Sequence, residues 1–117
     1  MNNNISAKKA LMCAACFMAS ISPSVTVAAV DVDAAKALAR KNSCFVCHSV
    51  DKEKDGPTFM KIAAKYRSKA DAEAKLAQHM TSGEKAKFPD GHEEDHKIIN
   101  TKDKGEIKNL VNWILAQ

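Results

Sequence analysis

Two cysteines and a histidine stand close together near the middle of the chain, in the order Cys44-Phe45-Val46-Cys47-His48. Two thiols at this spacing can add to the two vinyl groups on one edge of a haem, and the next residue then directs its imidazole at the iron. Neutral imidazole is a good iron ligand, and its second nitrogen usually donates a hydrogen bond that fixes the ring. The motif therefore predicts one haem c, bound covalently through Cys44 and Cys47, with His48 as an axial ligand.

Other sites that use two cysteines at this spacing fit the sequence less well. A zinc finger would place two histidines about a dozen residues further on, whereas the next histidine after His48 is His79. A thioredoxin-like redox pair would lie in a βαβ pattern, which does not surround these residues. A zinc-binding structural module using Cys44, Cys47 and histidines is the alternative, and it predicts a colourless protein that holds metal and no haem.

Residues 1–29 are typical of a cleaved secretory signal peptide. Two lysines, at positions 8 and 9, precede an apolar run over residues 10–21, which is too short to span a membrane. Small residues follow, and we place the cleavage after Ala29. Residues 30–117 would then form one domain in the bacterial periplasm. An uncleaved membrane anchor or a buried helix is the alternative interpretation of this segment.

Removal of the signal peptide would change both the cysteine count and the charge. Cys13 and Cys16 lie inside the segment, and we interpret them as apolar residues that are removed with it. The segment holds two lysines and no acidic residue, so 18 basic and 14 acidic side chains become 16 and 14, a formal charge of +2. This small charge argues against a nucleic-acid partner. No membrane span is expected after cleavage.

The mature part is expected to be all-α. Alternating runs of β-branched residues are absent, and apolar stripes with helical spacing are present instead. These stripes place helices at about residues 33–41, from residue 58 through the stripe that ends at Tyr66, at 71–82 and at 102–116. Residues 84–101 have no helical period and include a turn at Phe88-Pro89-Asp90-Gly91. A loop of this length usually carries function.

The order of these segments carries a resemblance to a known family. A first helix leads into C-F-V-C-H, then come G-P-T-F-M-K-I-A-A-K-Y and A-E-A-K-L-A-Q-H-M-T-S-G, and L-V-N-W-I-L stands near the end. The mature chain thereby resembles the short bacterial class I cytochromes c over nearly all of its length. The resemblance implies the cytochrome c fold, about four helices around one haem, with the last helix crossing the first. It also implies that the Pro57 carbonyl holds the proximal imidazole.

The same resemblance implies a role in electron transfer between periplasmic redox proteins, and no enzymatic reaction. Electrons would pass through an exposed haem edge near Cys44 and Cys47. We expect a monomer or a weak dimer, with redox proteins as donor and acceptor. The residues expected to pack around or beside the haem are apolar, namely Phe59, Ile62, Leu76, Met80, Phe88, Leu110, Trp113 and Ile114.

The loop before the last helix departs from that family at the sixth iron ligand. Class I cytochromes c usually provide a methionine there, but this chain has no methionine after Met80, and the corresponding residue is Lys97. We favour His96, the neighbouring residue and a strong iron ligand, with His92 as the second choice. The other candidates are Lys97, Met60, Met80 and His79.

The identity of the sixth ligand has consequences for function. Methionine at the iron raises the reduction potential, so a haem with two histidine ligands predicts a low-potential carrier. An open or displaceable distal site would instead predict a haem-based small-ligand binder or sensor. Residues 92–96 also match the zinc-protease pattern H-E-x-x-H. That site needs a helix with both histidines on one face, and this pentad follows a turn and has no apolar face, so we do not assign it.

Overall fold

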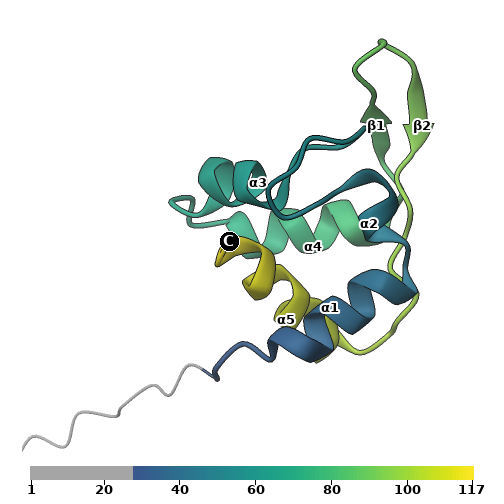
Figure 1. Cartoon of the computed structure of the whole chain (residues 1–117). Helices are drawn as coiled ribbons and strands as arrows, with labels where there is room; N and C mark the ends of the chain where they lie inside the picture. The colour runs from purple at the N-terminus through teal and green to yellow at the C-terminus, as the bar shows by residue number, and fades with distance from the viewer. Residues whose placement is uncertain (1–27) are drawn as a thin grey trace, which may run out of the picture.

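The structure, a computed structural model, describes residues 28–117 and folds them into five helices and one two-stranded sheet (Figure 1). The expected signal peptide, with Cys13 and Cys16, lies outside the described residues except for its last two. In chain order the elements are α1 (Val32–Lys41), α2 (Cys44–Cys47), α3 (Phe59–Tyr66), α4 (Ala72–Ser82), β1 (Lys85–Lys87), β2 (Glu93–Asp95) and α5 (Lys104–Leu115).

The helices begin at polar residues that bind their first free amides. The Asp31 carboxylate accepts from the Ala34 amide at 2.9 Å at the start of α1, and Thr58 Oγ1 accepts from the Lys61 amide at 3.1 Å at the start of α3. α4 ends at Gly83, which has the left-handed φ of 67° that favours glycine. The helix positions expected from the sequence are thus confirmed to within two residues.

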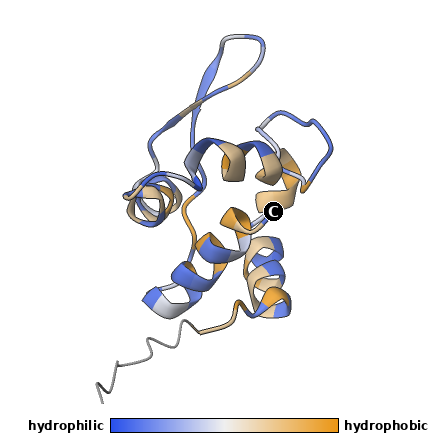
Figure 2. Cartoon of the chain, turned by 90° about the vertical axis from the view of Figure 1, so that its left-hand side faces the viewer, coloured by the Kyte–Doolittle hydropathy of each residue, from blue (hydrophilic) through white to orange (hydrophobic). Residues whose placement is uncertain are grey.

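α5 is the centre of the packing, because it contacts α1, α3 and α4. It crosses α1 (Figure 1), and Leu110 and Val111 are almost fully buried there. Asn109 joins the two helices through its side chain, which accepts from the Asp31 amide at 2.9 Å and donates to the Asp31 carbonyl at 2.8 Å. Figure 2 shows that apolar stretches of the helices face the interior, whereas the hairpin is mostly hydrophilic.

Most of the apolar residues expected around the haem are in the core. Six of the eight are buried, and Ile62 packs against that cluster while remaining partly exposed. Phe88 lies outside the cluster, and its ring stacks on His92 with centroids 4.3 Å apart. Within residues 28–117, no helix is long and apolar enough to cross a membrane.

A small hairpin occupies part of the segment without helical period. β1 and β2 pair antiparallel and project away from the helices (Figure 1). Their register places Lys85 opposite Asp95 and Lys87 opposite Glu93, with side-chain nitrogen–oxygen distances of 2.6 and 3.5 Å. The sequence pattern does not predict these strands, because charged cross-strand pairs stand where β-branched residues are usual.

Candidate haem site

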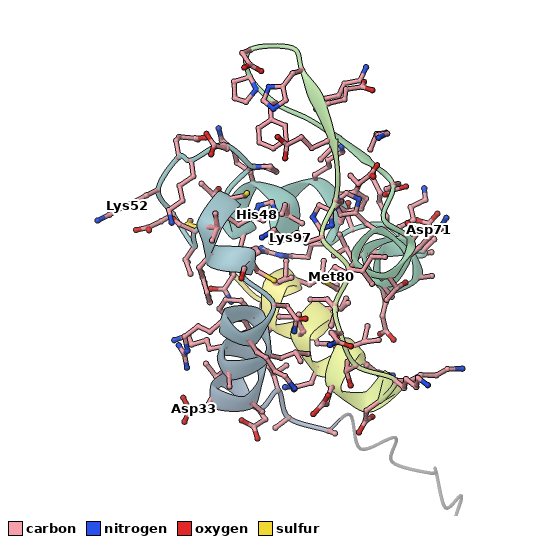
Figure 3. All side chains as sticks on the ribbon, turned by 90° about the vertical axis from the view of Figure 1, so that its right-hand side faces the viewer. Asp33, His48, Lys52, Asp71, Met80 and Lys97 are labelled. Atoms are coloured by element: carbon pink, nitrogen blue, oxygen red, sulfur yellow. The ribbon has the colours of Figure 1, made fainter. Side chains whose placement is uncertain are left out.

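A cavity of about 690 Å³ lies between α2 and the chain that follows it, α3, α4 and the hairpin. Its volume falls in the range of roughly 300–1,000 Å³ that is typical of cofactor pockets. Cys44, Cys47 and His48 line one side of it. His48, Met80 and Lys97 all line the cavity and lie together near the middle of the molecule in Figure 3, although they come from different parts of the chain.

The short helix α2 places the two cysteines and the histidine. Ser43 precedes it with a left-handed φ of 59°, which turns the chain sharply after α1. The His48 amide then donates to the Cys44 carbonyl at 2.9 Å, so that the single turn closes. Both cysteines are half-buried against the cavity, and Val46 between them is 63% exposed. The two thiols and the imidazole therefore meet the cavity from one turn of chain.

The His48 ring is held by contacts on several sides. Its Nδ1 donates to the Pro57 carbonyl oxygen at 2.7 Å, which leaves Nε2 as the nitrogen with a free lone pair. The Phe59 ring stacks against it, with centroids 5.5 Å apart and planes 23° apart. A Cβ at Gly56 would lie 2.6 Å from His48 Cε1, so only glycine allows this close approach.

The surroundings of His48 also favour its neutral form. Burial is the largest influence and lowers the pKa of the imidazole, the Pro57 carbonyl opposes this shift, and the positive charge of His79 adds to it. A neutral imidazole has the free lone pair that a metal ligand needs. The direction of this pKa shift suits a histidine that binds iron.

His96 lies across the cavity from His48. The two ring centroids are 6.2 Å apart and the planes differ by 49°. Two imidazoles bound to opposite sides of one metal ion, each at about 2.0 Å, would have centroids about 6 Å apart. His96 Nδ1 is buried and has no hydrogen-bond partner among the described residues. The spacing of these two rings and the paired thiols fit a haem c between them.

The other candidates for the distal side are placed differently. His92 is exposed on the hairpin and does not line the cavity, and Asp90, the main influence, together with Glu94 raises its pKa. Met60 is 50% exposed and also lies outside the cavity lining. His79, Met80 and Lys97 do line the cavity. The cavity lining therefore includes His79, Met80 and Lys97 beside His96, and it does not include His92 or Met60.

The zinc-site alternatives find no support in the described part of the chain. Among residues 28–117, no group of three or more histidine, cysteine, aspartate or glutamate side chains is arranged to hold a metal ion. The protease-like pentad runs through β2 rather than along a helix. Its two histidines thus lack the shared helical face that this pattern requires.

Two residues near His48 were not singled out for its support by the sequence pattern. In the sequence, Gly56 is only the residue before Pro57, and Phe59 is expected only to pack around or beside the haem. The spacing of Gly-Pro after the motif was a signal for Gly56, because a glycine directly before the proline frees space next to the imidazole. The stacking of Phe59 on His48 has no signal in the local sequence.

Comparison with known proteins agrees with this site. A family model described as Cytochrome c matches residues 32–117. Cytochrome c-552 of Nitrosomonas europaea is 37% identical over 79 residues, which cover 68% of this chain and 74% of that protein. Cytochrome c-551 of Allochromatium vinosum is 36% identical over 79 residues, covering 68% and 81%.

Solved structures give the same result. The crystal structure of the class 1 cytochrome MtoD from Sideroxydans lithotrophicus ES-1 is 73% identical, with a TM-score of 0.73, and the match covers 75% of this chain and 97% of that one. The crystal structure of cytochrome c552 from Nitrosomonas europaea is 32% identical with a TM-score of 0.53. The chain belongs to the cytochrome c family, as a class I electron-transfer cytochrome with one haem c attached through Cys44 and Cys47.

Proposed function

We propose that this chain is a periplasmic electron carrier whose iron is bound by His48 and His96 and whose reduction potential is low for its family. The observation that carries the proposal is the 6.2 Å separation of the two imidazole centroids across the cavity. It equals, within a few tenths of an ångström, the spacing expected for two rings on opposite sides of one metal ion.

Hydrogen bonds position both histidines, through the ring of His48 and through the main chain at His96. Nδ1 of His48 donates to Pro57, which directs the other nitrogen at the cavity. The His96 amide donates to the Glu84 carbonyl at 3.0 Å, and three residues later the Ile99 amide donates to the Met80 carbonyl at 2.9 Å. The main chain is thus fixed at His96 and again at Ile99, which favours a stable ligand over a displaceable one.

The haem supplies a one-electron change between ferric and ferrous iron. The protein contributes the axial ligands, an apolar wall and access for a partner. Imidazole stabilises ferric iron better than a thioether does, so a second histidine in place of methionine lowers the potential. Phe59, Leu110 and Ile114 exclude water from the inner wall, whereas exposed Val46 marks the edge at Cys44 and Cys47 where electrons would enter and leave.

The location of the protein is also part of the proposal. The composition of residues 1–29 supports export and cleavage after Ala29, and covalent attachment of haem to such a motif takes place outside the bacterial cytoplasm. We propose a monomer or weak dimer that exchanges electrons with other redox proteins and transforms no substrate. Amino-terminal sequencing of the protein from a periplasmic extract should begin at Val30, and a start at Met1 in the membrane fraction would contradict this.

Electron paramagnetic resonance of the ferric protein tests the two ligands. The full chain is produced in a bacterial host that attaches haem c, and the spectrum should be that of a low-spin haem with two imidazoles. His96→Ala should replace it with a high-spin signal. Met80→Leu, a substitution of similar volume in the same cavity, should leave the g values unchanged.

The opposite pattern would overturn the assignment. If Met80→Leu abolished the low-spin signal while His96→Ala kept it, Met80 would be the ligand and the potential would be high. A high-spin spectrum of the unchanged protein that binds carbon monoxide readily after reduction would point to a sensor. A redox titration gives an independent check, because His96→Met should raise the potential.

A further inference from the structure

His79, Glu84 and His96, which line the cavity on the side opposite His48, are linked to one another by contacts. His79, in the last turn of α4, donates through Nδ1 to the carboxylate of Glu84. The Glu84 carbonyl accepts from the His96 amide at 3.0 Å. The rings of His79 and His96 complete the group, with centroids 4.1 Å apart and planes at 46°. Glu84 therefore links α4, through the ring of His79, to the chain that follows β2, through the amide of His96.

The two imidazoles proposed as ligands are fixed by different means. His48 has a hydrogen bond from Nδ1 to Pro57, which sets the rotation of its ring. Nδ1 of His96 is buried without a hydrogen-bond partner among the described residues. Ligating histidines usually have such a partner on the second nitrogen. The rotation of the His96 ring must therefore be set by packing, and His79 is the aromatic ring nearest to it.

We propose that His79, held by Glu84, is a positioning residue that sets the rotation of the His96 imidazole and so the 49° angle between the two ligand planes. This inference rests on the proposed ligation by His48 and His96. His79 would act through contact with the His96 ring and not by binding iron. A tight turn at Gly83, which separates the end of α4 from Glu84, brings the carboxylate back to His79.

The angle between two axial imidazoles has a direct electronic consequence. Each ring donates π-electron density to one of the iron d orbitals, so nearly parallel rings separate the orbital energies and nearly perpendicular rings leave them close. The largest g value of low-spin ferric haem rises as the angle increases. A ring that rotates freely gives a distribution of angles and hence a broad signal. The largest g value and its line width therefore report the orientation of His96.

The test compares this signal in the holoprotein and in matched variants. His79→Ala should keep the two-imidazole spectrum but shift or broaden the signal at the largest g value. Glu84→Ala, which leaves the His79 ring in place but removes its anchor, should have a smaller effect in the same direction. Glu84→Gln should restore the native signal, because its amide oxygen still accepts from His79 Nδ1.

The control is His92→Ala, because His92 also stacks on a neighbouring ring and pairs with a carboxylate but lies outside the cavity lining. It should leave the signal unchanged. A native signal in both His79→Ala and Glu84→Ala would overturn the positioning role while leaving His48 and His96 as ligands. Loss of the two-imidazole spectrum in His79→Ala would assign His79 as the ligand instead. An unchanged protein without that spectrum would overturn the proposed function itself, and this inference with it.

Discussion

Gly56 is the glycine at which an added Cβ would have the least room, and it lies beside the haem site. A Cβ at this position would lie 2.6 and 2.8 Å from His48 Cε1 and Nδ1, and 2.9 Å from the Cys47 carbonyl oxygen. A Cβ atom does not approach atoms to which it is not covalently linked this closely in real proteins. Gly56→Ala must therefore displace the imidazole, because the carbonyl belongs to the main chain of the attachment motif and is already bound by the Gly56 amide at 2.8 Å.

The free-energy change follows from two contributions. Forcing a methyl group into a well-packed site destabilises a protein by about 1–3 kcal/mol. Displacing His48 also weakens its 2.7 Å hydrogen bond to Pro57, which contributes about 0.5–1.5 kcal/mol. We expect Gly56→Ala to lower the free energy of unfolding by roughly 2–4 kcal/mol. At about 4–8 °C for each kcal/mol in a domain of this size, the melting temperature should fall by roughly 10–30 °C.

The assay is thermal unfolding of the ferric holoprotein, followed by circular dichroism and by absorption of the haem. The low-spin resonance spectrum should change in the same variant, because a displaced His48 binds iron poorly. Gly91→Ala is the matched control, since φ is 91° there but no atom lies within 4 Å of the added Cβ. It should lose only about 1–2 kcal/mol from its left-handed backbone and keep the native spectrum. A native melting temperature and spectrum for Gly56→Ala would refute the reasoning.

Three further substitutions test the packing and the surface. Leu110→Ala removes a side chain that is 1% exposed in the centre of the helical core, and denaturant unfolding should show a loss of about 2–5 kcal/mol. Asn109→Ala removes both hydrogen bonds to the Asp31 main chain, and the same assay should show a loss of about 1–3 kcal/mol; an unchanged midpoint would mean that water replaces these bonds fully. Lys61→Ala breaks an ion pair with Glu53 in which both side chains are 65% exposed. It should change stability by less than about 0.5 kcal/mol at low and at high salt, and a larger loss that salt removes would contradict this expectation.

The predictions that succeeded from sequence concern features made by neighbouring residues. The two haem-attachment cysteines lie within one turn of chain, so their spacing alone indicates their chemistry. Helix positions followed from apolar periodicity and from capping residues such as Asp31 and Thr58, since both signals act within a few residues. The hairpin could not be predicted in this way, because its strands are three residues long and are paired by charges across the turn.

The distal side of the site depends on contacts between distant parts of the chain. Several histidines, methionines and a lysine had suitable chemistry in the sequence, and the position of His96 before the last helix favoured it without separating it from the other candidates. The structure places His96 opposite His48 because the carbonyl of Glu84 binds the His96 amide and the carbonyl of Met80 binds the Ile99 amide. It also places His92 away from the cavity, only four residues earlier, because that part of the chain extends into the hairpin.

The sequence by itself determined that this is a helical protein with one covalently attached haem, because residues adjacent in the chain are sufficient to attach it. Only the tertiary structure decided which imidazole faces His48, which glycine leaves room for that ring, and which side chain stands behind His96. Those relations join residues that are 8 to 48 positions apart in the sequence. They arise when the helices pack and the hairpin closes, and local propensity carries no information about them.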